Sequence, residues 1–235
     1  MLNKLKIKIF ADGADYDQII NFNDNPLIQG MTTNPSLMKK AGINNYQEFC
    51  KKVCDKVKDK PLSFEVFTDD FKDMIRQSKI INNWGKNVFV KIPITNTKGQ
   101  SSNQIIKELN NEGIKLNITA IFTKPQISEL QKNLNPKIKN YISIFAGRIA
   151  DTGIDPNGIM KFGITMANEI NSEVIWASCR EVLNIFQAEK VNCHIITVPH
   201  SILNKLDKIG YDLNDYSEET VKEFYEDSLK AGFKL

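Results

Sequence analysis

Short runs of apolar, β-favouring residues alternate along the whole chain with stretches in which apolar residues recur at helical spacing. The helical spacing is clear from Phe71 to Ile81, and we expect Thr68 to cap this helix and Gly85 to end it. The apolar runs that we expect to form strands are Ile7–Ala11, Leu27–Thr33, Leu62–Phe67, Val88–Ile94, Leu116–Phe122, Tyr141–Ala146, Val174–Ala177 and Ile195–Val198.

Helical spacing returns between most of these runs. Further helices are expected around Ile105–Leu109, Ile127–Leu134 and Ile159–Ile170, and a C-terminal helix at about 217–231. Strands that alternate with helices predict an α/β fold, and eight such units in 235 residues fit one closed (β/α)8 TIM barrel, a single domain over residues 1–235. A doubly wound open sheet with the same number of strands is the alternative.

Composition narrows the class of protein. Hydrophobic residues make up 41% and charged residues 25% of the chain, the balance of an ordinary globular protein. The 31 basic and 28 acidic residues are mixed along the chain and give a net charge of +3, so the sequence predicts no binding to nucleic acid. No run is long and apolar enough for a transmembrane helix, and the amino terminus lacks the apolar core of a signal peptide, so we expect no membrane partner and a cytoplasmic location.

Four cysteines occur without the spacing of a metal site. Cys50 and Cys54 share a face of an expected helix, and Cys179 and Cys193 stand alone. We expect all four to be reduced thiols in the core and predict no metal ligands.

Polar residues interrupt nearly every expected strand toward its carboxyl end, which is where TIM barrels assemble their active sites. Burying a polar side chain costs free energy unless it is paired, so this repetition needs a functional reason. Residues two apart in a strand point the same way, and these side chains should therefore converge in one pocket. The residues are Asp12, Thr33, Asn34, Glu65, Lys91, Asn117, Thr119, Ser143 and Ser178.

Lys91 is the most informative of these residues because it lies inside the apolar run Val88–Ile94. A lysine held out of water can lose its charge and act as an amine nucleophile. The alternative is a structural lysine in a buried ion pair with Glu65 or Asp12.

Several segments resemble the transaldolase family, and they follow one another in order from Asp12 through Phe224. Gly30–Leu37 resembles the signature after the second barrel strand, and Val90–Pro93 resembles the strand that carries the Schiff-base lysine. Leu116–Phe122, Ile142–Arg148 and Trp176–Arg180 resemble the fifth, sixth and seventh strands. The chain length is similar to that of the short transaldolase and fructose-6-phosphate aldolase subfamily.

The resemblance implies a role for each position. Lys91 would form a Schiff base with a ketose, Asp12 would be the acid/base for carbon–carbon cleavage, and Glu65 and Thr119 would hold a water that relays protons. Asn34, Asn117 and Ser143 would bind the three-carbon unit, and Arg148, Ser178 and Arg180 would bind the phosphate. Thr33 and Phe145 would also be substrate-binding residues.

Simpler roles remain open for the binding residues. Asn34 could shape the turn before Pro35, and Ser143 and Ser178 could be satisfied core hydroxyls. Arg148 and Arg180 could pair with carboxylates on the rim. We assign no catalytic role to His194 or His200.

The resemblance implies transfer of a dihydroxyacetone unit from sedoheptulose 7-phosphate or fructose 6-phosphate to glyceraldehyde 3-phosphate or erythrose 4-phosphate, as in the pentose phosphate pathway. Phe145 and Glu65 are the residues of transaldolases, whereas aldolases of the subfamily generally carry tyrosine and glutamine there. A fructose-6-phosphate aldolase or a specialised sugar-pathway aldolase is one alternative, because Gly13–Asp15, Pro199–His200 and Glu223–Ser228 depart from the family pattern. A catalytically inactive barrel that binds sugar phosphates is another.

The same resemblance bears on cofactors and assembly. It implies no metal or organic cofactor, because the lysine imine itself accepts the electrons. It also implies a homo-oligomer, possibly a decamer, linked through the C-terminal helix.

Overall fold

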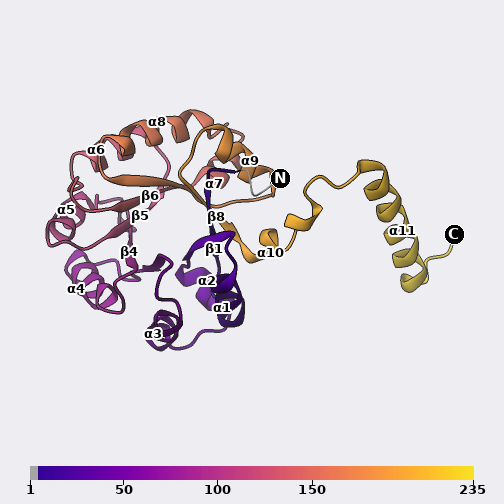
Figure 1. The fold of residues 1–235 in the computed structure, drawn as a ribbon, viewed down its shortest axis with the longest axis horizontal. Coiled ribbons are helices and arrows are strands. Elements are labelled where there is room, and N and C mark those ends of the chain that lie inside the picture. Colours follow the sequence, from indigo (N-terminus) through magenta and orange to yellow (C-terminus); the bar gives the residue numbers. More distant parts are fainter. Residues whose placement is uncertain (1–4) are drawn as a thin grey trace.

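Eight parallel strands close into a barrel in the computed structural model, which describes residues 5–235 (Figure 1). Each strand pairs with the next along the chain, and β8 pairs with β1. The closure confirms the TIM barrel and excludes the open sheet. The strands are β1 (Lys8–Asp12), β2 (Ile28–Thr32), β3 (Leu62–Glu65), β4 (Val88–Pro93), β5 (Leu116–Ile121), β6 (Asn140–Ile144), β7 (Ser172–Trp176) and β8 (Ile195–Pro199).

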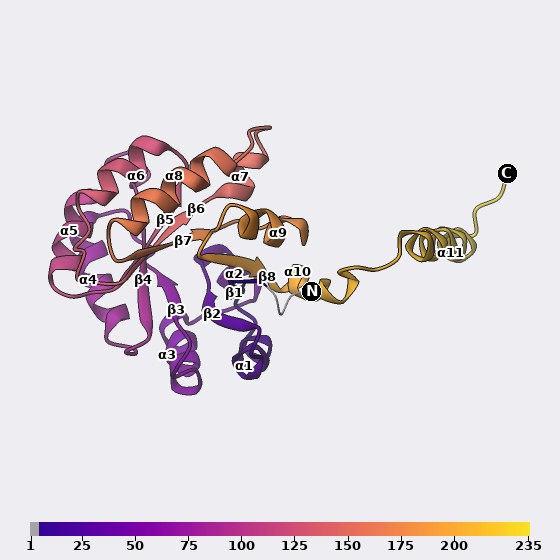
Figure 2. The same ribbon diagram turned by 45° about the horizontal axis from the view of Figure 1, so that its top comes forward.

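Helices surround the barrel on its outer face (Figures 1 and 2). They are α1 (Tyr16–Asp24), α2 (Pro35–Lys40), α3 (Tyr46–Lys56), α4 (Phe71–Asn82), α5 (Asn103–Asn111), α6 (Lys124–Gln131), α7 (Ala146–Ala150), α8 (Asn157–Asn168), α9 (Leu183–Lys190) and α10 (His200–Leu203). A 3₁₀ turn, η2 (Leu206–Lys208), and a last helix, α11 (Leu213–Ala231), follow them in the chain.

Two helix starts differ from the sequence prediction. Asp70, not Thr68, caps α4, because the Asp70 carboxylate accepts the hydrogen bond of the Asp73 amide. The C-terminal helix begins earlier than expected, at Leu213, because the carboxylate of Asp212 caps its first amides.

The strand register brings the inward-facing polar residues side by side. Asp12 pairs with Thr32, and Glu65 pairs with Lys91, which pairs in turn with Asn117. Because side chains alternate between the two faces of a strand, these residues share the inner face with every second residue before and after them.

Aromatic rings fill the inner face on the amino-terminal side of these polar residues. Tyr141 stacks on Phe89 with ring centroids 4.0 Å apart and meets the edge of Phe10 at 5.7 Å. Gly30 leaves room for this packing, because a Cβ there would lie 2.5 Å from the Phe10 ring. These three rings form a buried cluster inside the barrel, on the amino-terminal side of the polar residues.

The outer core consists of apolar side chains between the barrel and the helices. All four cysteines are buried and free, as predicted, and Cys50 and Cys54 lie on the inner face of α3. No helix described between residues 5 and 235 combines the length and apolarity needed to cross a membrane.

The helix α11 stands away from the barrel in both views (Figures 1 and 2). None of its residues is buried, although it carries large apolar side chains such as Phe224, Tyr225 and Leu229. It ends at Gly232, whose left-handed conformation (φ 67°) caps the helix.

Candidate active site

A cavity of about 520 Å³ opens at the carboxyl-terminal ends of the strands. Every residue that the sequence predicts for the site lines this cavity except Thr33. The cavity wall also includes residues that the sequence analysis did not select, namely Thr32, Pro35, Ser36, Leu37, Ala120, Ala177, Cys179, Thr197 and Pro199.

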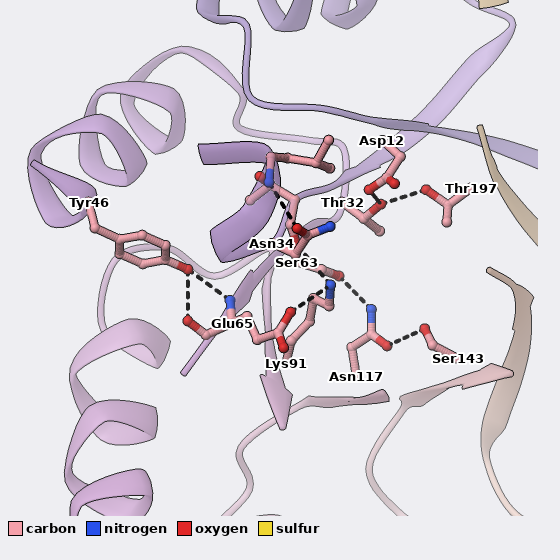
Figure 3. Close-up of polar contacts among 12 residues, drawn as sticks. Asp12, Thr32, Asn34, Tyr46, Ser63, Glu65, Lys91, Asn117, Ser143 and Thr197 are labelled. Carbon is pink, nitrogen blue, oxygen red and sulfur yellow. Dashed lines mark hydrogen bonds and ion pairs between the residues drawn. The ribbon is translucent and has the colours of Figure 1, made fainter. Parts of the chain in front are cut away.

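Lys91 projects from β4 into the base of the cavity, and only 6% of its surface is exposed. Its Nζ lies 3.0 Å from Glu65 Oε2 (Figure 3). The same Nζ donates a hydrogen bond of 2.8 Å to the carbonyl oxygen of Thr33. Of the two carboxylates considered as partners, Glu65 is therefore the one in direct contact. A neutral amine has two N–H groups and a lone pair, so it can keep both contacts and still attack a carbonyl carbon.

Thr33 contributes its backbone rather than its side chain. Its carbonyl accepts from Lys91, while its hydroxyl is buried without a partner among the described residues.

Asp12, at the end of β1, accepts a hydrogen bond of 2.7 Å from the Thr32 hydroxyl at Oδ1. The Thr32 and Thr197 oxygens are 2.5 Å apart. Because Thr32 gives its only proton to Asp12, Thr197 must donate to Thr32. Burial raises the pKa of Asp12, and the charge of Lys91 and the Thr32 hydrogen bond oppose that rise. A carboxyl group with a raised pKa suits acid–base chemistry.

A second chain of hydrogen bonds crosses from β3 to β6 on the same inner face. The Asn117 side chain donates a hydrogen bond of 3.0 Å to Ser63 Oγ and accepts one of 2.7 Å from the Ser143 hydroxyl (Figure 3). These bonds fix the orientation of the Asn117 amide and leave one N–H and the Ser143 oxygen lone pairs for a ligand. Thr119, two residues beyond Asn117, lines the cavity with a buried hydroxyl that has no partner in the described part of the chain.

Asn34 combines the two roles considered for it. Its side-chain oxygen accepts 3.0 Å from the Leu37 amide and caps α2, so it does shape the turn before Pro35. The residue also lines the cavity.

The two arginines lie exposed at the rim. Arg180 pairs with Asp151, which is the simpler role proposed for it. No ion pair holds Arg148 within residues 5–235, and its guanidinium lies 5.4 Å from the centroid of the Phe145 ring. Both arginines line the same cavity, where two positive charges can meet an anion.

The backbone is strained where it shapes this mouth. Ser178 and Ala120 have positive φ angles of 65° and 59°, which non-glycine residues rarely adopt. The Ser178 carbonyl packs directly on Gly147, where a Cβ would come within 1.6 Å of the carbonyl oxygen. The loop that carries Ser178 and Arg180 therefore depends on a glycine in α7.

The histidines lie outside the cavity wall. His194 Nδ1 accepts from the Val174 amide at the amino-terminal side of the barrel, and the His200 ring packs against Gly13 and Phe22. No group of three or more potential metal-binding side chains gathers within the described residues.

Four polar residues of the site were not predicted from the sequence, namely Thr32, Ser63, Thr197 and Tyr46. Ser63 lies two residues before Glu65, so strand alternation could have identified it. Thr32 and Thr197 carry hydroxyl groups inside apolar strands, which is the pattern that predicted the other polar residues of the site. Tyr46 could not have been found in this way, because it reaches Glu65 from a helix.

The comparisons with known proteins agree with this geometry. Residues 9–235 match the family model described as transaldolase/fructose-6-phosphate aldolase. A probable transaldolase from Thermoanaerobacter is 36% identical over 97% of this chain and its own whole length, and one from Methanococcus maripaludis is 36% identical over 91% of this chain and 94% of its own.

Solved structures are similar in fold alone. A chain of the tryptophan synthase complex of Pyrococcus furiosus superposes with a TM-score of 0.54 at 10% identity, covering 94% of this chain and 98% of its own. The sequence matches carry the family assignment. The chain belongs to the transaldolase/fructose-6-phosphate aldolase family.

Proposed function

We propose that the protein is a transaldolase that transfers a dihydroxyacetone unit between phosphorylated sugars through a Schiff base at Lys91. The observation that carries this proposal is the buried Lys91 Nζ, held 3.0 Å from the Glu65 carboxylate at the base of a cavity lined with hydroxyl groups. Family membership supports the same class of reaction.

In the proposed reaction, the Lys91 amine adds to the ketose carbonyl and forms the nitrogen–carbon bond. The carbonyl oxygen then leaves as water. Glu65 and Thr119 hold the water that moves these protons, because the Glu65 carboxylate can accept a proton beside Nζ and the unpartnered Thr119 hydroxyl can donate or accept. Such proton transfer contributes roughly 10²–10⁴-fold to a rate.

Cleavage follows from the imine. Asp12 takes the proton of the C4 hydroxyl as the C3–C4 bond breaks, and the bonding electron pair moves into the iminium to give an enamine. The first aldehyde leaves, an aldose phosphate enters, and the reverse steps return the proton and release the new ketose. The Thr32 hydrogen bond occupies Asp12 Oδ1, which leaves Oδ2 for the substrate hydroxyl.

Polar side chains around Lys91 would retain the three-carbon unit while the aldehydes exchange. Asn34, Asn117 and Ser143 offer donors and acceptors to its hydroxyls. Arg148, Arg180 and Ser178 would bind the phosphate at the mouth, with Arg180 exchanging Asp151 for the substrate anion.

Phe145 favours transaldolase over aldolase chemistry, because its ring lines the cavity without a proton to donate to the enamine. The test supplies fructose 6-phosphate with and without erythrose 4-phosphate. We expect glyceraldehyde 3-phosphate to form rapidly only when the acceptor is present. Rapid release of dihydroxyacetone without an acceptor would assign the chain to the aldolases, and no turnover of either kind would support the inactive sugar-phosphate-binding barrel.

The assembly, the location and the pathway are part of the same proposal. The exposed apolar residues of α11 support a homo-oligomer, possibly a decamer, because such a face is costly to leave in water. Light scattering tests this: Phe224→Lys should lower the molar mass, whereas Glu223→Lys on the same helix should not. A monomeric wild-type protein would contradict it.

The proposed substrates are sugar phosphates of the pentose phosphate pathway. They therefore indicate a cytoplasmic enzyme of that pathway.

A further inference from the structure

The strands β2 and β3 separate just before Glu65. Their last paired residues are Thr32 and Ser63, and the last hydrogen bond between the two chains runs from the Thr33 amide to the Ser63 carbonyl. The amides of Met31 and Thr33 bond to the carbonyls of residues 61 and 63, so the next amide in the series, at residue 35, should bond to the Glu65 carbonyl.

The next amide does not exist, because residue 35 is a proline and has no N–H group. The matching acceptor for the Glu65 amide would be the Thr33 carbonyl, but that oxygen accepts from Lys91 Nζ instead. The amide and the carbonyl of Glu65 that face β2 therefore both lack a hydrogen-bond partner in that strand.

Tyr46, the first residue of α3, takes the place of the missing strand. Its hydroxyl donates a hydrogen bond of 2.8 Å to the Glu65 carbonyl and accepts one of 2.9 Å from the Glu65 amide (Figure 3). The ring is held by edge contacts with Phe67, at 5.0 Å between centroids, and by Trp84 at 6.2 Å. One hydroxyl thus satisfies a backbone donor and a backbone acceptor of the same part-buried residue.

We propose that Tyr46 is a positioning residue for imine formation. It fixes the backbone of Glu65, so that the carboxylate stays 3.0 Å from Lys91 Nζ, and it keeps the Glu65 amide from competing for the Thr33 carbonyl that Nζ uses. Without the hydroxyl, the Glu65 amide would be drawn toward that carbonyl and the carboxylate would shift. The proposal rests on the Schiff-base function proposed above.

The variant Tyr46→Phe tests this role, because it removes the hydroxyl and keeps the ring. The measurement is the single-turnover rate of adduct formation at Lys91 with fructose 6-phosphate, trapped by borohydride and followed by peptide mass, across pH. We expect the rate to fall roughly tenfold to 100-fold, because small displacements of a proton-transfer group are costly. Tyr16→Phe is the matched control: it removes a hydroxyl from neighbouring α1 and should leave the rate unchanged.

The same substitution in a Glu65→Gln variant distinguishes a positioning role of Tyr46 from a general loss of activity. In Glu65→Gln the carboxylate that Tyr46 positions is absent, so adding Tyr46→Phe should change the remaining rate less than about twofold. An equal loss in both backgrounds, or a wild-type rate and pH profile in Tyr46→Phe alone, would overturn the role of Tyr46 and leave the Schiff-base function standing. Absence of any adduct in the wild-type protein would overturn both.

Discussion

The Thr32 hydroxyl donates its only proton to Asp12 Oδ1 over 2.7 Å. Burial is the largest influence on the pKa of Asp12 and raises it, whereas the Thr32 hydrogen bond stabilises the carboxylate and lowers it. Together with the charge of Lys91, Thr32 therefore favours the ionised form of Asp12, which is the form that the proposed mechanism needs to accept the proton of the C4 hydroxyl.

Replacing Thr32 with valine should move the acid limb of the kcat profile to higher pH. The change keeps the shape of the side chain and removes the hydrogen bond, so the pKa of Asp12 rises further. Thr197→Val should give a smaller shift in the same direction, because Thr197 acts on Asp12 only through Thr32. Superimposable profiles for wild type and Thr32→Val would show that Asp12 is not the group that titrates.

The same raised pKa predicts that Asp12 costs stability at neutral pH. In the unfolded chain the carboxyl titrates near its ordinary value of 3.8, whereas the folded protein holds the proton to higher pH. Ionisation therefore disfavours the folded state as the pH rises through this interval. The free energy of unfolding of Asp12→Asn, relative to wild type, should increase between pH 4 and pH 7 in urea titrations. A difference that stays constant or shrinks as the pH rises would contradict this.

Gly147 should be intolerant of even one methyl group. A Cβ would meet the Ser178 carbonyl, so Gly147→Ala must displace the loop that carries Ser178 and Arg180. Overpacking of this kind costs about 1–3 kcal/mol, which thermal unfolding would detect, and a raised KM for the sugar phosphate should accompany it. Gly158→Ala, in α8 with open space around its Cβ, is the control and should be neutral or stabilising. Equal melting temperatures for the two variants would argue against the close approach.

The fold could be predicted because the signals were local and repeated. Strand-length apolar runs alternating with helical spacing predicted all eight strands and their closure into a barrel. Most inward polar residues could be found because they interrupt apolar strands, as Lys91 does in β4.

Features that depend on long-range contacts could not be read from the sequence. Tyr46 contacts Glu65 from a different element. A rim carboxylate was expected for Arg180, but its identity as Asp151 depends on the packing of α7 against the loop after β7. The predicted cap of α4 was wrong because Thr68 and Asp70 are both good capping residues. The geometry of the loop selects Asp70.

The central claim is that Lys91 forms the imine, and one measurement tests it directly. The protein is incubated with fructose 6-phosphate, reduced with borohydride, digested and analysed by mass spectrometry, with Lys91→Met as the control. We predict a stable three-carbon or six-carbon adduct on the peptide that contains Lys91, and none in the variant. An unmodified Lys91 in a protein that turns over the sugar, or an adduct at another lysine, would contradict the proposed chemistry.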